Sequence, residues 1–232
     1  MDYKDMNHSI LQDMLDYEKI KDKLIVKPVN YDNFKSRIEN NVHIKIGDMA
    51  LVLHALVRND DIINYLITVR INNTSLESWG KGREELIEEA LINTSKIYNP
   101  MVYFGQTEIN HPNRGKGDYM SENGRILNPA EMMFCTFTTY PETINGAISF
   151  WYPGVKEKIA EFAGGDYYVV FTGISEFHAH AVNMITVESL YKNLEGMNKY
   201  VNRDDELLTR YIYRYNHLSK ELERVDSSRI VS

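Results

Sequence analysis

Apolar positions follow a helical spacing in four stretches of the chain. Residues 9–24 carry such a pattern behind Ser9, a good helix-capping residue, and predict an N-terminal helix. Residues 78–98 give a second helix after two glycines, with glutamates at its start that suit the positive end of a helix dipole. Residues 154–164 and 186–201 predict two further helices, the first ended by glycine and the second begun by threonine.

Other apolar runs indicate strands. Residues 49–57 and 62–71 lie on either side of the turn-forming sequence "RNDD", which predicts a hairpin, although the first run also fits a buried helix. Residues 24–30, "LIVKPVN", predict an extended segment in which Pro28 excludes a central strand position.

The second half of the chain is richer in β-branched and aromatic residues. Residues 132–154 predict a hairpin that turns at Asn145 and Gly146. Residues 166–174 and 175–182 predict two antiparallel strands, and residues 211–225 begin as a strand of alternating tyrosines and end in charge.

Together these elements predict one α+β domain, with a mostly antiparallel sheet and interspersed helices. The expected division is an N-terminal helix at 1–24, the α+β domain at 25–216 and a charged C-terminal tail at 217–232. Residues 105–128 are rich in glycine, asparagine and charge, and predict a long surface loop within the domain.

Charge and composition exclude some classes of binding partner. The chain of 232 residues has 33 acidic and 26 basic side chains, a net charge of -7 and no basic run, so we expect no nucleic-acid partner. Its longest apolar run is too short to cross a bilayer, which predicts no membrane span. One cysteine, Cys135, and no visible secretion signal favour a cytoplasmic protein.

One stretch suggests a metal site. In "GISEFHAHAV", residues 173–182, Glu176, His178 and His180 alternate with apolar residues, so a strand would place all three on one face. Two imidazoles and a carboxylate are ligands for a divalent ion such as zinc, with His111 or His54 as a further donor. The alternative is the polar face of a half-exposed strand, with no cofactor bound.

Several catalytic signatures are missing from the sequence. It has no HExxH, CxxC or GxSxG motif and no phosphate-binding loop of the GxxxxGK type. The absence of these motifs favours a protein that binds a protein partner over an enzyme. Exposed strand edges would also permit a homodimer.

Two segments resemble a known family. These are "SLESWGKGREELIEEALINT" and "TYPETINGAISFWYPGVKEKIAEFAGGDYYVVFTGISEF", and with the closing "YIYRYN" the likeness covers residues 25–216. The family is number 5688 in the series of domains of unknown function, found mainly in gut Firmicutes. Its members usually read Ser-Ile-His-Glu where this chain reads Gly173-Ile174-Ser175-Glu176, so chemistry carried by that histidine is not expected here.

The resemblance implies a bacterial host and a genomic setting near mobile elements, and it implies no established activity. In that setting, a small acidic protein could inhibit a host defence protein by binding it, which is counter-defence. The sequence therefore leaves three hypotheses: an uncharacterised binding protein, a phage or mobile-element inhibitor, and a metal-dependent enzyme that uses Glu176, His178 and His180.

Overall fold

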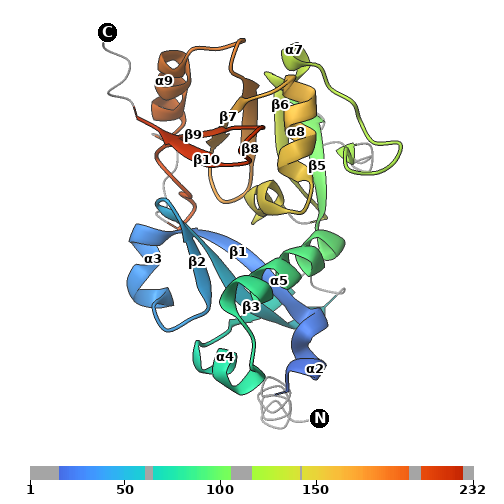
Figure 1. The fold of residues 1–232 in the computed structure, drawn as a ribbon, viewed down its shortest axis with the longest axis vertical. Helices are drawn as coiled ribbons and strands as arrows, with labels where there is room; N and C mark the ends of the chain where they lie inside the picture. The colour runs from blue at the N-terminus through green and yellow to red at the C-terminus, as the bar shows by residue number, and fades with distance from the viewer. Residues whose placement is uncertain (1–15, 61–64, 106–116, 142, 199–204, 227–232) are drawn as a thin grey trace. The chain divides into compact units, whose positions relative to one another are not determined.

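The computed structural model describes residues 16–60, 65–105, 117–141, 143–198 and 205–226. The chain divides into two compact units, Met1–Ile97 and Tyr98–Ser232 (Figure 1). Each unit combines an antiparallel sheet with helices, which confirms the α+β class with interspersed helices. No helix among the described residues is long and apolar enough to cross a membrane.

Unit 1 contains α2 (Tyr17–Ile20), a 3₁₀-helix (Lys21–Lys23), β1 (Leu24–Asn30), α3 (Tyr31–Ile38), β2 (His43–Ile46), β3 (Met49–Asp60), β4 (Tyr65–Arg70), α4 (Thr74–Trp79) and α5 (Arg83–Ile97). Unit 2 contains β5 (Asn99–Phe104), α7 (Pro129–Met132), β6 (Cys135–Tyr140), a 3₁₀-helix (Gly146–Trp151), α8 (Val155–Ala163), β7 (Tyr167–Phe171), β8 (Phe177–Ala181), α9 (Val187–Asn198), β9 (Ile212–Tyr215) and β10 (Leu222–Val225).

The sheet of unit 1 is built around β3. Strand β1 pairs with the first part of β3 on one side. On the other side β2 pairs with the start of β3 and β4 with the remainder, and all pairs are antiparallel. Ala50 and Val52 pack with Ile38 of α3. Since successive side chains point to opposite faces, Leu51 and Leu53 face the other way, and α5 packs against β1, β2 and β3. Both faces of the first half of β3 are therefore buried.

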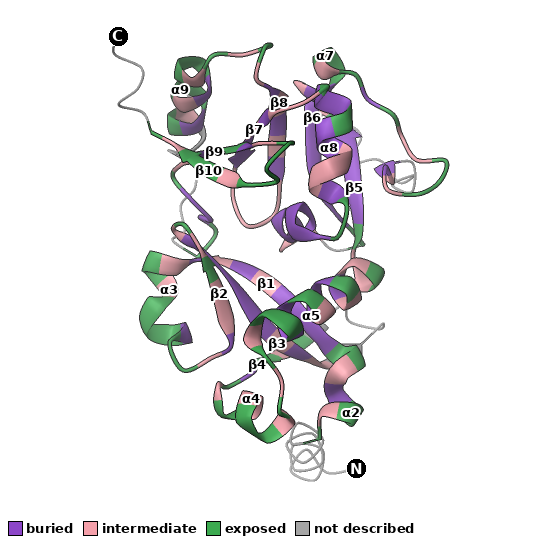
Figure 2. Cartoon of the chain, in the orientation of Figure 1, coloured by how far each residue is buried: buried purple, intermediate pink, exposed green. Residues whose placement is uncertain are grey.

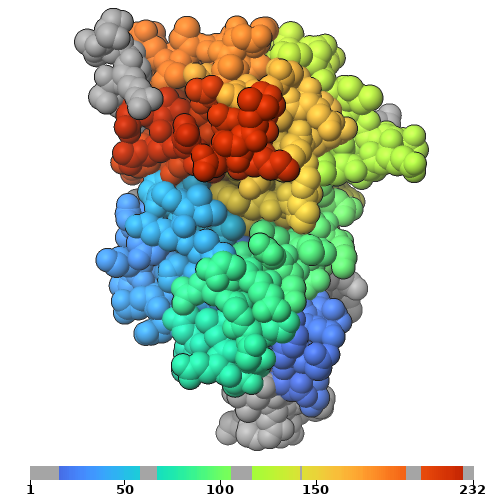
Figure 3. All heavy atoms as spheres, in the orientation of Figure 1, coloured from blue at the N-terminus to red at the C-terminus, as the bar shows by residue number. Residues whose placement is uncertain are grey.

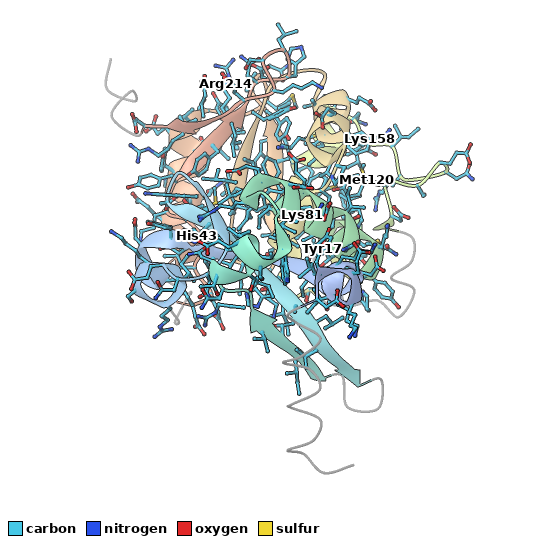
Figure 4. All side chains as sticks on the ribbon, turned by 60° about the horizontal axis from the view of Figure 1, so that its bottom comes forward. Tyr17, His43, Lys81, Met120, Lys158 and Arg214 are labelled. Atoms are coloured by element: carbon cyan, nitrogen blue, oxygen red, sulfur yellow. The ribbon has the colours of Figure 1, made fainter. Side chains whose placement is uncertain are left out.

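Most of the expectations for unit 1 are confirmed. The hairpin forms, but β3 runs on to Asp60, so three residues of "RNDD" belong to the strand and residues 61–64 lie outside the described residues. Strand β1, which carries Pro28, pairs with β3 alone among the described strands. Residues 17–23 are helical, while residues 1–15 of the expected N-terminal helix are not described. Tyr17 lies under the Lys81 ammonium, 4.9 Å from the ring centre (Figure 4).

Unit 2 has a six-stranded antiparallel sheet with the order β10-β9-β7-β8-β6-β5. Figure 2 shows β5 and β6 mostly in the purple of buried residues. An aromatic cluster fills the core on one face: Phe137 stacks on Phe177 at 5.1 Å between ring centres, and Trp151 stacks on Phe171 at 5.2 Å. Phe150 meets both Phe171 and Phe177 edge-on. These contacts anchor β6, β7 and β8 to the 3₁₀-helix.

The hairpin expected in residues 132–154 is wrong. Strand β6 forms, but residues 146–151 make a 3₁₀-helix, and the hairpin-like partner of β6 is β5. Gly146 explains the difference, because a Cβ there would lie 2.1 Å from Thr138 Oγ1 and 2.2 Å from the Ser175 carbonyl oxygen. The glycine serves a close backbone approach rather than a two-residue turn.

Two other segments differ from the expectation of exposed loop and tail. Tyr119, inside the expected loop at 105–128, is fully buried and meets Phe137 edge-on at 5.5 Å. Residues 106–116 of that loop lie outside the described residues. The expected charged tail at 217–232 contains β10, whose Leu222–Val225 pair with Ile212–Tyr215 of β9. Its two charged residues are exposed between partly buried Leu222 and Val225, and β10 is the last strand in the order of the sheet, where charged side chains are common.

Candidate functional site

Strand β8 holds the residues that the sequence pointed to. Phe177, Ala179 and Ala181 are buried, and the two histidines between them are half-buried on the opposite face. The expected alternation is therefore confirmed for the strand. The histidine face is not fully solvated, however, because the sheet places β6 and β7 on the two sides of β8.

His178 is held by one hydrogen bond. Its Nδ1 lies 2.9 Å from the Cys135 carbonyl oxygen. Because a carbonyl oxygen only accepts, Nδ1 donates the hydrogen in this contact, and Nε2 is the ring nitrogen left for a ligand. Metal-binding histidines have this arrangement when a backbone carbonyl fixes the ring.

His180 lies beside His178 in a drier position. The two rings are nearly parallel, 15° apart, with centres separated by 6.4 Å. The buried His180 Nδ1 has no hydrogen-bond partner in the described part of the chain. Burial, with the nearby charge of His178 as the second cause, lowers the pKa of His180 to about 4. The ring is therefore neutral at pH 7, the form that binds a metal without first losing a proton.

Glu176 precedes β8, and its carboxylate accepts a hydrogen bond from Thr172 Oγ1 at 3.1 Å. Within the described ranges, no group of three or more His, Cys, Asp or Glu side chains is close enough together to hold a metal ion. Of the two further donors considered, His111 lies outside the described residues and His54 lies in β3 of unit 1. Strand β8 thus offers two imidazoles to a ligand.

A second polar cluster in unit 2 was not expected from the sequence. Asp166 accepts a hydrogen bond from the His217 backbone at 3.0 Å, contacts His217 Nδ1 at 2.6 Å and pairs with Arg214 at 2.5 Å. The His217 hydrogen bonds, followed by Arg214, lower the pKa of Asp166 to about 2. Figure 3 shows the C-terminal residues, in red, at the surface.

This cluster ties β7 to the turn after β9. No spacing rule could find it, because its members are 48 and 51 residues apart. The alternation of "YIYRYN" gave the only indication, since it places Arg214 on the side of β9 opposite to its buried tyrosines. These contacts hold the β9–β10 hairpin in place, which gives the cluster a structural role.

One comparison with known proteins gives a match, to a family of unknown function (DUF5688) over residues 2–217. The chain belongs to this family. The match extends through unit 1 and most of unit 2, including β8 and β9, and it confirms the resemblance found in the sequence. Neither the curated proteins nor the solved structures contain a significant match.

Proposed function

We propose that this family member acts by binding a protein partner through an open β-ribbon. The ribbon consists of residues 56–60 of β3 and residues 65–69 of β4. The observation that carries the proposal is the pairing of β3, which has neighbours on both sides in its first half and only one neighbour in its second half.

The registers define where the sheet becomes a ribbon. Strand β1 pairs with β3 only as far as Ala55, and β2 pairs only as far as Val52. Beyond that point β4 is the only described strand that pairs with β3. Figure 4 shows the ends of the two strands projecting as a two-stranded ribbon, in the fainter cyan and teal of Figure 1. Both of its edges offer unpaired backbone groups, a template for another strand.

Apolar side chains point outward on β4. Ile67 is 43% exposed and Val69 is 38% exposed, and as alternate residues they share one face. An isolated two-stranded ribbon is only marginally stable in water. A partner strand added to the edge would supply backbone hydrogen bonds and cover these side chains at once, so the occupant we propose is an extended segment of another protein.

The cellular location and the identity of the partner also belong to the proposal. A cytoplasmic bacterial location, and a counter-defence role in which the partner is a host defence protein, both rest on the sequence alone. The same edge would also suit a second copy of this chain, because strand edges pair readily with themselves. The experiment below separates a foreign partner from a homodimer.

The test compares Ile67→Lys/Val69→Lys with Ile92→Lys. Ile92 is a matched control, since it is 44% exposed on α5 of the same unit. Each tagged full-length protein is expressed in its natural host, and captured proteins are quantified by mass spectrometry, while light scattering measures self-association. We expect one partner to be enriched by wild type and Ile92→Lys and lost in the double variant. Equal capture by all three proteins would refute the ribbon as the binding site.

The metal-dependent enzyme stays as a second candidate because of one observation. A backbone carbonyl fixes Nδ1 of His178, whose ring lies beside that of a neutral His180. Elemental analysis of the untagged protein, before and after His178→Ala/His180→Ala, tests it directly. One zinc, iron or manganese per chain that vanishes in the variant would show that the strand completes a metal site with a further ligand. Equal metal content in both proteins would refute it.

A further inference from the structure

A group of cationic side chains lies on one face of the unit 1 sheet. His54 of β3 is directly opposite Arg70 of β4, so the two side chains share a face. Lys27 of β1 pairs with Val52, and Thr68 of β4 pairs with Leu56, which puts both at diagonal positions around His54. The Lys27 ammonium reaches across β3 and donates a hydrogen bond to Thr68 Oγ1 at 2.8 Å.

Lys27 is half-buried without an acidic partner. Within the described chain, the bond to Thr68 is its one polar contact, and burial alone lowers the pKa of the ammonium. A buried ammonium normally pairs with a carboxylate, because water no longer solvates its charge. The absence of such a pair is notable in a protein with a net charge of -7.

His54 is equally unsatisfied. Its buried Nδ1 has no hydrogen-bond partner among the residues that the structure describes, and its ring is half-buried. Burial is the main cause that lowers the pKa of His54 to about 3, and the charges of Lys27 and Arg70 act in the same direction. Both cations are therefore close enough to act on the ring. A neutral imidazole still offers one N–H to an acceptor.

The remaining donors are free to turn toward a ligand. Thr68 accepts from Lys27, so its own hydroxyl hydrogen can donate elsewhere. Arg70 is exposed and uses Nη1 to donate to the Arg37 carbonyl oxygen at 2.7 Å, which leaves other guanidinium N–H groups. An ammonium, a guanidinium, a hydroxyl and an imidazole N–H thus converge on one patch.

We propose that Lys27, Thr68 and Arg70, with the ring of His54 between them, form a binding site for a small phosphate-bearing anion. Such an anion supplies the missing negative charge and has enough oxygen acceptors for four kinds of donor. A carboxylate carries a single negative charge, whereas a phosphate group carries up to two and so matches the two cations, Lys27 and Arg70, more closely. Thr68 and Arg70 lie on the face of β4 opposite to Ile67 and Val69, so a partner that covers those two apolar side chains leaves the anion site open.

The test measures thermal unfolding of the full chain against inorganic phosphate, glycerol phosphate and acetate at constant ionic strength. Variants are Lys27→Met and Arg70→Gln, and the matched control is Lys45→Met, an exposed lysine on β2 of the same sheet. We expect a saturable rise in Tm with a phosphate compound in wild type and in the control. We expect the affinity to fall about tenfold to a hundredfold in each site variant, as for loss of one charge-assisted hydrogen bond.

The two phosphate compounds separate the sources of the anion. A stronger response to glycerol phosphate would assign the site to a phosphate ester, and a stronger response to inorganic phosphate would assign it to the free ion. Phosphate also stabilises proteins generally by exclusion from their surface, an effect that does not saturate and is equal in all variants. Such an equal response, or saturation by acetate at the same concentration, would overturn the proposal. Ring signals of His54 in NMR spectra that stay unchanged as phosphate is added would also overturn it.

Discussion

The unpaired nitrogen of His180 makes a testable contribution to the pH dependence of unit 2. Its pKa in the folded chain is about 4, below the ordinary value of 6.5. The unfolded chain therefore binds a proton more readily than the folded chain between these values. The contribution of His180 to stability is therefore fully present above pH 6.5 and is lost as the pH falls toward 4. The shift corresponds to at most about 3 kcal/mol, and screening of the half-buried ring reduces it to roughly 1–2 kcal/mol.

The substitution His180→Leu isolates this effect. It removes the titrating ring and the orphaned nitrogen but keeps an apolar side chain of similar size. Because an unpaired buried polar atom costs free energy, we expect the variant to be as stable as wild type at pH 7, or more stable. We also expect the loss of stability between pH 6.5 and 4 to shrink by about 1–2 kcal/mol.

Urea unfolding followed by tryptophan fluorescence measures both quantities. Trp79→Phe in every protein leaves Trp151, which stacks on Phe171 in unit 2, as the only tryptophan. His178→Leu is the comparison, since it removes the hydrogen bond from the imidazole to the Cys135 carbonyl oxygen and should cost about 1 kcal/mol at pH 7. A loss of more than about 2 kcal/mol in His180→Leu at pH 7 would show that its nitrogen has a partner. An unchanged pH profile would refute the assigned titration.

Three further predictions concern unit 2, each measured by urea unfolding. Gly146→Ala should lower the free energy of unfolding by at least about 2 kcal/mol, because the new Cβ would lie 2.2 Å from a backbone oxygen. Gly196→Ala lies inside α9 with open space around it and should raise the free energy of unfolding by about 0.5–1 kcal/mol. Equal effects of the two substitutions would contradict this reasoning. Asp166→Asn should lower stability at pH 7 and remove the loss of stability that wild type shows as the pH falls from 3.8 to about 2, since the carboxyl has a lower pKa in the folded chain. If the variant lost the same stability in this pH range, the His217 contacts would not be the cause of the lowered pKa. Tyr119→Phe should be neutral or stabilising, because the buried hydroxyl has no hydrogen-bond partner among the described residues. A clear loss of stability would indicate a hydrogen bond to another part of the chain.

Local sequence patterns predict the elements whose burial follows a simple period. Helix α5 is an example, since Leu86, Ile87, Ala90 and Leu91 form its buried stripe. Strand β8 is another, because its apolar residues alternate strictly with histidines. In both cases one face meets one neighbouring layer, so the period of the side chains records the packing.

The errors arise where a residue serves a distant contact. Asn145 and Gly146 look like a turn, yet the glycine is needed because Thr138 and Ser175 approach it. Tyr119 lies in a polar, glycine-rich segment, and only the tertiary structure shows that its ring reaches Phe137. The same limit applies to the sites: spacing identified the two histidines of β8 but not Lys27 and Thr68, which meet only through strand register. Local propensity cannot encode such partners.

Strand β4 links the two proposals and also keeps them separable. Its alternate residues Ile67 and Val69 face one way, while Thr68 and Arg70 face the other. A strand added along the edge of β4 would use backbone groups and cover Ile67 and Val69, and it would leave the Lys27 ammonium in place. Ile67→Lys/Val69→Lys should therefore abolish partner capture without changing the phosphate response, and Lys27→Met should do the reverse. If either variant abolished both activities, a rearranged β4 rather than two distinct faces would explain the losses, and neither site assignment would stand.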